Sequence, residues 1–371
     1  MDWGLTYPAH IHSWEWVSYG EPKGFSAYMP YDTQCIGSDV YQTLALCALH
    51  TERMKLGTGI TNPRSRIAPV TADSFATLNE LAPGRVVVGI SSGNTARRTL
   101  GMPASRLAEI REHVEILRAM FKGEEAPYTE GPDRYMDRAR NRYAKFLNPT
   151  GGFVNIADPI PIWVAGSGPK ALELAGEIGD GVILFGAIGE SFVNYAMDHI
   201  RVGAERAGKN PDDLYKLVMT AFHITKPGQL LEDPEVKRAV GPFVASSLNL
   251  TALALVNAET KAIATAKGTP LPADVREGIM SFADAYYVGE LGIERRHLQL
   301  YSEYLLGWKE EHAPLVTPEM IKTSTLTGSA EEILETCHRL EEQGINQVMI
   351  QPILDPKETI DRFHENIMSR Y

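Results

Sequence analysis

Two stretches decide the fold class: residues 54–63 read MKLGTGITNP, and residues 84–93 read GRVVVGISSG. Each joins strand-forming apolar residues to small and polar residues that favour a turn, so we predict strands at 54–60 and 85–90. The segment between them, 69–81, repeats apolar residues at helical spacing. A strand, a helix and a second strand in this order predict a parallel βαβ unit.

The same alternation continues along the whole chain. We predict eight strands, at residues 3–7, 25–31, 54–60, 85–90, 160–165, 181–185, 217–224 and 347–351. The helices are predicted at residues 38–50, 69–81, 107–121, 169–178, 192–207, 329–340 and 355–367. Ser38 is the expected N-cap of the first of these helices. Strands that alternate with helices are parallel and joined by right-handed crossovers, so the predicted fold class is α/β, a (β/α)8 TIM barrel.

Two segments are longer than ordinary connections, namely residues 122–159 and 226–325. The second has a mostly helical pattern and lies between the predicted strands seven and eight. We interpret it as a helical insertion over the barrel mouth, and we therefore expect residues 1–371 to form a single domain.

Composition excludes several classes of function. The 371 residues carry 36 Lys and Arg against 47 Asp and Glu, and a net charge of −11 disfavours nucleic acid and acidic membranes as partners. Cys35, Cys47 and Cys337 are far apart, which predicts reduced thiols and no metal site. No signal peptide or bilayer-spanning segment is visible, so we expect no membrane association and a cytoplasmic protein.

Catalytic groups of a parallel barrel follow the C-terminal ends of its strands. One such end reads Gly166-Ser167-Gly168, directly before a helix whose first residue is Pro169. Glycines let the backbone approach an anion, and the free amides of the first helical turn attract it. These residues are a candidate phosphate loop, although a tight turn without a ligand fits the same pattern.

Several motifs in the same order resemble one known family. They are LGTGITNP at 56–63, LNELAPGR at 78–85, VGISSG at 88–93 and AGSGPKALELAGEIGDG at 165–181. The chain resembles the luciferase-like superfamily of flavin- and deazaflavin-dependent oxidoreductases over residues 1–120, 155–225 and 320–371. It is most similar to the coenzyme F420-dependent branch, which contains methylenetetrahydromethanopterin reductases.

The resemblance implies roles for individual residues in cofactor binding. It implies a cis peptide between Gly59 and Ile60, where an ordinary trans strand end is the alternative. It also implies that the remaining matched positions contact the ring, the ribityl chain or the phosphate: Asn62, Ser92, Gly93, Arg97, Gly166, Ser167 and Gly168.

Asp32 and His10 are the candidate catalytic residues. Asp32 matches the acidic residue that the family carries after strand two, although Thr33 replaces the histidine that often follows it. His10 lies close to the end of strand one, and histidine exchanges protons near neutral pH. A hydrogen-bonded histidine in a polar pocket is the alternative interpretation.

Four arginines follow strands three and four in an otherwise acidic chain. They are Arg64, Arg66, Arg97 and Arg98. They could bind a phosphate or the polyglutamate tail of the deazaflavin coenzyme, or they could form a solvated surface cluster.

The expected function is hydride transfer between coenzyme F420 and a small organic substrate. One alternative is a two-component monooxygenase that receives reduced FMN from a partner flavin reductase. A second alternative is a barrel that binds flavin without catalysis. Homodimers are usual in the family, so we expect one here.

Overall fold

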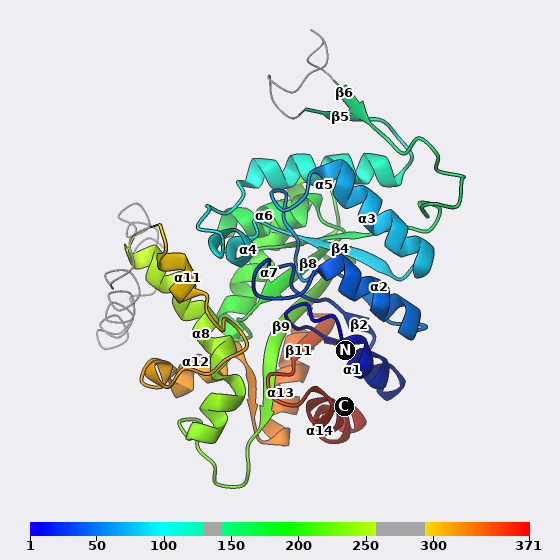
Figure 1. Cartoon of the computed structure of the whole chain (residues 1–371). Coiled ribbons are helices and arrows are strands. Elements are labelled where there is room, and N and C mark those ends of the chain that lie inside the picture. Colours follow the sequence, from blue (N-terminus) through cyan, green and yellow to red (C-terminus); the bar gives the residue numbers. More distant parts are fainter. Residues whose placement is uncertain (130–141, 257–293) are drawn as a thin grey trace.

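Eight parallel strands form a closed barrel at the centre of the computed structural model, which describes residues 1–129, 142–256 and 294–371 (Figure 1). The barrel strands are β1 (Asp2–Leu5), β2 (Ala27–Tyr28), β3 (Lys55–Gly57), β4 (Val86–Ile90), β7 (Ile162–Ala165), β8 (Gly181–Phe185), β9 (Tyr215–Ile224) and β11 (Gln347–Gln351). Each pairs in parallel with the next, and β11 pairs with β1 to close the ring. The predicted (β/α)8 fold class is confirmed.

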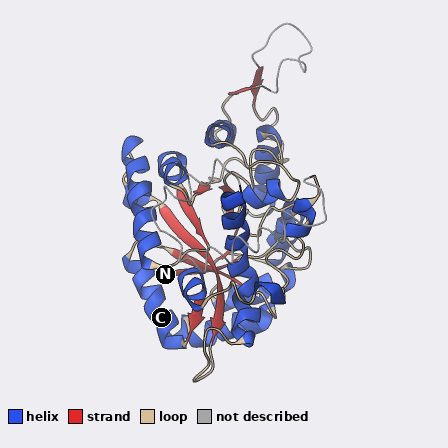
Figure 2. Cartoon of the chain, turned by 90° about the vertical axis from the view of Figure 1, so that its left-hand side faces the viewer, coloured by secondary structure: helices blue, strands red, loops and turns tan. Residues whose placement is uncertain are grey.

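Helices surround the barrel on its outside, as Figure 2 shows with the red strands enclosed by blue helices. They are α1 (Trp14–Gly20), α2 (Val40–His50), α3 (Ala68–Leu81), α4 (Asn94–Arg98), α5 (Leu107–Phe121), α6 (Pro169–Ile178), α7 (Glu190–Arg206), α13 (Ala330–Glu342) and α14 (Pro356–Asn366). One apolar cluster fills the layer between strands and helices, and a second fills the barrel interior. The barrel strands are therefore packed on both faces, and this packing fixes the positions of their C-terminal ends.

The predicted helical insertion is present between β9 and β11. Its described helices are α8 (Pro234–Val256), α11 (Arg296–Leu300) and α12 (Pro318–Ser324). Residues of α8 belong to the same apolar cluster as the barrel interior, and the rings of Phe243 and Phe185 lie 5.0 Å apart. The described part of α8 thus packs on the barrel interior, while the expectation that the segment 226–325 forms a single domain with the barrel stays a prediction.

Several local predictions were wrong or incomplete. The segment 122–159 contains an antiparallel hairpin of β5 (Ala126–Tyr128) and β6 (Arg142–Ala144), and the insertion ends in a short strand, β10 (Leu326–Gly328), that pairs with β9. Asp39, not Ser38, is the N-cap of α2, because its carboxylate accepts the amides of Tyr41 and Gln42. An N-cap side chain accepts the amides of the residues two and three positions after it. In α2 these amides belong to Tyr41 and Gln42, so the cap is Asp39.

Within residues 1–129, 142–256 and 294–371, no helix is both long and apolar enough to cross a bilayer.

The contact between α6 and α7 depends on glycine. A Cβ at Gly203 would overlap the Glu173 carbonyl oxygen and lie 2.6 Å from its carbon. We expect Gly203→Ala to lower the free energy of unfolding by about 1–3 kcal/mol through overpacking, although alanine favours a helix by about 1 kcal/mol. Urea denaturation measures the change. Val202→Ala, on the 45% exposed neighbour, is the control and should change stability by less than about 0.5 kcal/mol. An unchanged or higher stability of Gly203→Ala would contradict the packing described.

Candidate functional site

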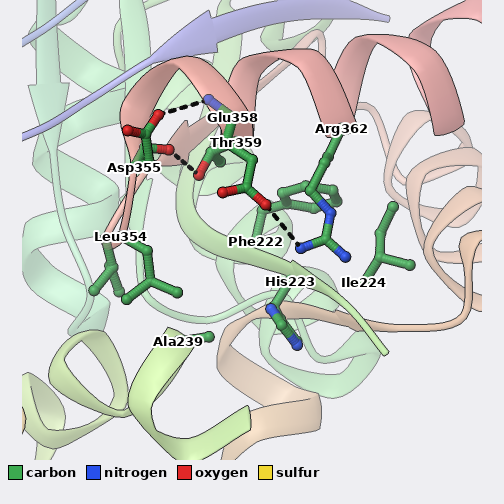
Figure 3. A pocket seen from close by; sticks show the side chains of 10 residues that line it. Phe222, His223, Ile224, Ala239, Leu354, Asp355, Glu358, Thr359 and Arg362 are labelled. Carbon is green, nitrogen blue, oxygen red and sulfur yellow. Dashed lines mark hydrogen bonds and ion pairs between the residues drawn. The ribbon is translucent and has the colours of Figure 1, made fainter. Parts of the chain in front are cut away.

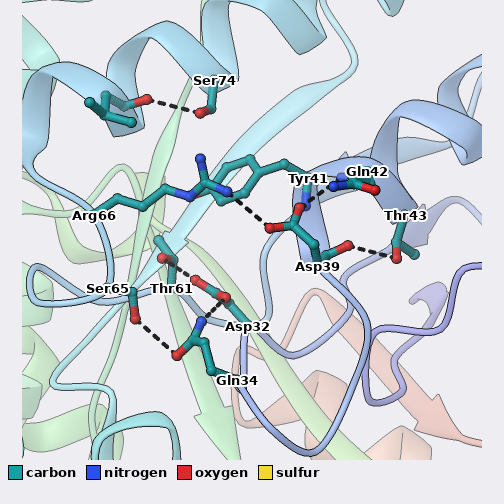
Figure 4. A network of polar contacts seen from close by, with 11 residues as sticks. Asp32, Gln34, Asp39, Tyr41, Gln42, Thr43, Thr61, Ser65, Arg66 and Ser74 are labelled. Atoms are coloured by element: carbon teal, nitrogen blue, oxygen red, sulfur yellow. Dashed lines mark hydrogen bonds and ion pairs between the residues drawn. The ribbon is translucent and has the colours of Figure 1, made fainter.

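Asp32 is a buried carboxylate at the end of β2, with an exposed fraction of 6% (Figure 4). Its Oδ2 accepts a hydrogen bond from Thr61 Oγ1 at 2.6 Å, and its Oδ1 accepts one from Gln34 Nε2 at 2.6 Å. Burial raises the pKa of Asp32, while these two hydrogen bonds and the Arg66 charge act in the opposite direction. A buried carboxyl whose pKa is raised holds a proton more readily than an exposed one, which suits proton exchange.

The same network reaches Asn62 at the end of β3. Asn62 Nδ2 donates to Ser65 Oγ at 2.7 Å, and Ser65 Oγ donates to Gln34 Oε1 at 3.2 Å. Asn62 Oδ1 accepts the amides of Arg64 and Ser65. One N–H and the carbonyl oxygen of the Asn62 amide are thereby engaged, so the orientation of this side chain is fixed by its own loop.

Gly93, after β4, lies directly against Asn62. Its φ is +67°, and a Cβ at this position would overlap the Asn62 side chain. Only glycine meets both conditions without strain. The structure thus brings Asp32, Asn62 and Gly93 together from the ends of three neighbouring strands.

The predicted cis peptide between Gly59 and Ile60 is confirmed. Gly59 donates its amide to the Pro30 carbonyl at 2.8 Å, and Thr61 donates its amide to the Gly89 carbonyl at 2.8 Å. Ile60 is half-buried and packs against the apolar cluster of the barrel interior. The amides of Gly59 and Thr61 therefore join the ends of β2, β3 and β4.

The candidate phosphate loop begins where β7 ends. Gly168 is the N-cap of α6 and supplies no side-chain hydrogen bond to the first turn, and Ser167 is exposed. A Cβ at Gly166 would lie 2.8 Å from the Ala171 carbonyl carbon, so glycine is required for this close approach. Ser91 Oγ donates to the Ala165 carbonyl at 2.7 Å and so ties the end of β4 to this loop. The start of α6 has the properties of an anion-binding helix terminus.

Ser92 lies between these two parts of the site, at the end of β4. It is half-buried, and its carbonyl accepts the Ser105 amide at 2.8 Å.

The four arginines differ in their hydrogen-bond partners: two pair with carboxylates, and two donate to neutral oxygens. Arg64 pairs with Glu109, and Arg66 pairs with Asp39 at 3.0 Å while its guanidinium lies 4.2 Å from the centre of the Tyr41 ring. Arg97 and Arg98 are held by neutral oxygens instead: Arg97 Nε donates to the Pro103 carbonyl at 3.4 Å, and Arg98 Nε donates to Asn94. An anionic ligand would therefore meet less competition at Arg97 and Arg98 than at the other two.

His10 is placed apart from the Asp32 network. It is exposed, its Nδ1 accepts the His12 amide at 3.3 Å, and the two rings lie 5.7 Å apart. Its carbonyl accepts a hydrogen bond from Ser13 Oγ. The two candidate residues therefore differ in their surroundings: Asp32 is buried in a hydrogen-bonded network, whereas His10 is exposed.

An aromatic wall, formed by Tyr31, Phe185 and Phe243, was missed by sequence reasoning. The Tyr31 and Phe185 rings lie 5.8 Å apart, and Phe185, at the end of β8, is 38% exposed. Tyr31 donates its hydroxyl to Gln351 Oε1 at 2.8 Å, and Gln351 Nε2 donates to the Leu305 carbonyl of the insertion at 2.9 Å. Tyr31 and Phe185, as the last residues of two predicted strands, were the signal that was available in the sequence.

Residues 11–347 match the family described as luciferase-like monooxygenase, and the chain belongs to this family. The 5,10-methylenetetrahydromethanopterin reductase of Archaeoglobus fulgidus is 26% identical over 361 residues, which cover 96% of this chain and 95% of the relative. The reductase of the same name from Methanolobus tindarius is 34% identical over 190 residues, 51% of this chain and 54% of that protein. The chain thus spans about half the length of several curated relatives in these alignments.

Among solved structures, the coenzyme F420-dependent tetrahydromethanopterin reductase of Methanopyrus kandleri has a TM-score of 0.67 to this chain. The two are 20% identical, and the superposition covers 100% of this chain and 99% of the other. This similarity establishes that the two proteins share the barrel fold.

Asp32→Asn tests the buried carboxyl by its effect on stability. Because burial raises the folded-state pKa of Asp32 above its unfolded value, wild-type stability should fall as pH rises through that pKa. Asparagine does not titrate, and turning the Gln34 amide over would preserve both hydrogen bonds. The difference in unfolding free energy, variant minus wild type, should therefore increase with pH.

The measurement is urea denaturation at several values between about pH 4 and pH 8. Asp198→Asn, at an exposed carboxylate on α7, is the control and should show no comparable trend. A difference that stays constant or decreases with pH would be evidence that Asp32 is not held in the environment described.

Proposed function

We propose that this protein transfers a hydride between coenzyme F420 and a small organic substrate at the C-terminal mouth of its barrel. The observation that carries the proposal is the buried Asp32 carboxyl, joined to Thr61 directly after the cis peptide and to Asn62 through Gln34 and Ser65. The named activities of relatives that align along nearly the whole chain or share its fold support the choice of F420.

The residues present fit such a cofactor at the start of α6. Gly168 offers no side chain that competes for the amides of the first turn, and Gly166 lets the preceding loop pass close to the Ala171 backbone. Asn62 and Gly93 pack directly against each other at the neighbouring strand ends. When bound, coenzyme F420 supplies or accepts the hydride.

The protein would contribute proton exchange and the exclusion of water. Asp32 exchanges the proton, and Thr61 and Gln34 hold its carboxyl in one orientation. On the substrate side, Phe185 and Phe243 provide an apolar wall, which keeps water from the reacting atoms. A small organic molecule that carries one oxygen function suits this combination of one acid and an aromatic wall.

Gly168→Asp tests the cofactor site. A carboxylate at the N-cap would occupy the amides of α6 and repel a phosphate, so the affinity for F420 should fall by about tenfold or more. Gly168→Asn is the matched control, because asparagine has the same size without the charge, and it should bind more tightly than the aspartate variant. Titration followed by cofactor absorbance measures both. If the aspartate variant binds F420 as tightly as wild type, the phosphate lies elsewhere.

Arg97 and Arg98 should distinguish the two cofactors. F420 continues beyond its phosphate into a chain of carboxylates, whereas FMN ends at the phosphate. Changing both arginines to glutamine should weaken F420 binding by about tenfold at low salt and should affect FMN less. Wild-type affinity for F420 should decrease at high salt, and Arg201→Gln on α7 should behave as wild type.

The same titrations test the proposed function as a whole. Tight, salt-insensitive binding of FMN with negligible binding of F420 would favour the monooxygenase alternative. Binding of neither cofactor by the folded wild-type protein would overturn the proposal.

A further inference from the structure

Tyr304 brings the insertion into contact with the loop that follows β4. Thr95 Oγ1, in the first turn of α4, donates to the Tyr304 hydroxyl at 3.4 Å, and this hydroxyl donates to the Ser246 carbonyl of α8 at 3.5 Å. Thr95 lies two residues after Gly93, which packs against Asn62. The insertion therefore reaches the strand ends beside the proposed cofactor site.

The position of Tyr304 lies between two opposite sides of the barrel. The carbonyl of the next residue, Leu305, accepts a hydrogen bond from Gln351 Nε2 at 2.9 Å, and Gln351 is the last residue of β11. Thr95 follows β4, and three strands separate β4 from β11 in either direction around the ring. The Tyr304 side chain therefore reaches across the mouth from the end of β11 towards α4.

The residues before and after Tyr304 have left-handed backbone conformations. The φ of Glu303 is +58° and that of Leu305 is +65°, values that residues with a side chain rarely adopt. The Glu303 carbonyl accepts the Gly307 amide at 2.8 Å, and Leu305 is buried. Such conformations persist only where surrounding contacts enforce them, and they are concentrated at ligand-binding sites. The local structure thus holds Tyr304 in one position.

The hydroxyl of Tyr304 is nevertheless bound only weakly by its present partners. Hydrogen bonds between two oxygens are ordinarily about 2.5–3.0 Å long, so both contacts are at the outer limit, and the described part of the chain gives this hydroxyl no shorter one. Burial raises the pKa of Tyr304, whereas Thr95, Ser246 and Arg98 act in the opposite direction. The hydroxyl therefore keeps its proton at neutral pH and can donate it to an oxygen that comes closer.

Space for a ligand lies beside the half-buried Tyr304. A hollow of about 260 Å³ opens to solvent between α8 and the chain that follows α11, and Tyr304, Ser246 and Leu305 are among the residues that line it. Glu303 and Lys309, which carry opposite charges, also border this hollow. The surroundings therefore suit an uncharged ligand better than an anion or a cation.

We propose that Tyr304 is a substrate-binding residue whose hydroxyl donates a hydrogen bond to an uncharged oxygen of the substrate. The inference rests on the proposed function and assigns a donor to the oxygen of that substrate. Thr95 donates to the Tyr304 oxygen, which polarises the hydroxyl and strengthens the hydrogen bond that it donates in turn. The insertion thereby contributes directly to substrate binding.

Isobutyramide is the probe, because it carries an uncharged carbonyl oxygen on a small apolar group and an amide resists hydride transfer. The full-length protein is saturated with F420, and isobutyramide binding is followed by ligand-observed NMR. Tyr304→Phe removes only the hydroxyl and should weaken isobutyramide binding by about three- to tenfold, the loss expected for one hydrogen bond between neutral groups. Its affinity for F420 should match that of the wild type.

Matched variants and a second probe serve as controls. Thr95→Val should weaken isobutyramide binding less than Tyr304→Phe does, because it removes only the polarising donor, and Thr95→Ser should restore it. Tyr143→Phe, at a residue of β6 that is 65% exposed, should bind as the wild type does. Isobutylamine, which has a similar shape but no oxygen, should bind more weakly than isobutyramide, and equal binding would overturn the inference.

The surface pocket between the end of β9, α8 and the start of α14 is a second place where the probe could bind (Figure 3). Among the described residues, its lining includes Asp355, Glu358 and Arg362 and none of residues 300–312. Arg362→Gln should therefore leave the isobutyramide affinity unchanged. A loss of affinity in Arg362→Gln but not in Tyr304→Phe would assign the probe to this pocket and overturn the inference.

The inference and the proposed function can fail separately. If the wild type binds F420 but binds isobutyramide no more tightly than Tyr304→Phe does, the inference alone is wrong. An equal loss of F420 and isobutyramide affinity in Tyr304→Phe would also overturn it, because the residue would then act on the structure of the whole site. A wild-type protein that binds no F420 would overturn both.

Discussion

The backbones of β3 and β4 come so close at Gly89 that a side chain there would overlap the Thr58 carbonyl oxygen. Thr58 Oγ1 donates to the Gly89 carbonyl at 2.6 Å, and the Thr61 amide donates to the same oxygen at 2.8 Å. These contacts set the path of the chain as it leaves β3. Thr61 and Asn62 are positioned by that path, and through them so are Asp32 and the contact with Gly93.

The sequence was enough to predict the barrel because its signals are repeated and local. Each strand and helix follows from apolar spacing, and small residues such as Gly59 and Gly93 mark the ends where backbones must approach closely. Asp32 and Asn62 were singled out because they lie just after predicted strands and match positions of the family that the chain resembles. The hairpin of β5 and β6 could not, because its strands are short and Pro127 interrupts the first of them.

The parts of the site that were missed depend on contacts between distant segments. Arg64 and Arg66 seemed available for a ligand, but each has an acid that folding brings from another part of the chain, namely Glu109 and Asp39. Phe243 meets Phe185 only because the insertion folds back over the mouth. No local pattern in a single sequence records such pairings, since they follow from the path of the chain in space.

The insertion leaves the barrel at the end of β9 and returns through β10, which pairs with Phe222–Ile224 of that same strand. Its two ends are thus fastened side by side, whatever the length of chain between them. The entropy of closing such a loop grows only slowly with its length. Segments of different size and sequence can therefore be exchanged at this point while the chain before β9, which carries Asp32, Asn62 and the start of α6, keeps its geometry. Under the proposed function, the architecture would separate the insertion, which borders the substrate side, from the residues that hold the cofactor, so the first can diversify without rebuilding the second.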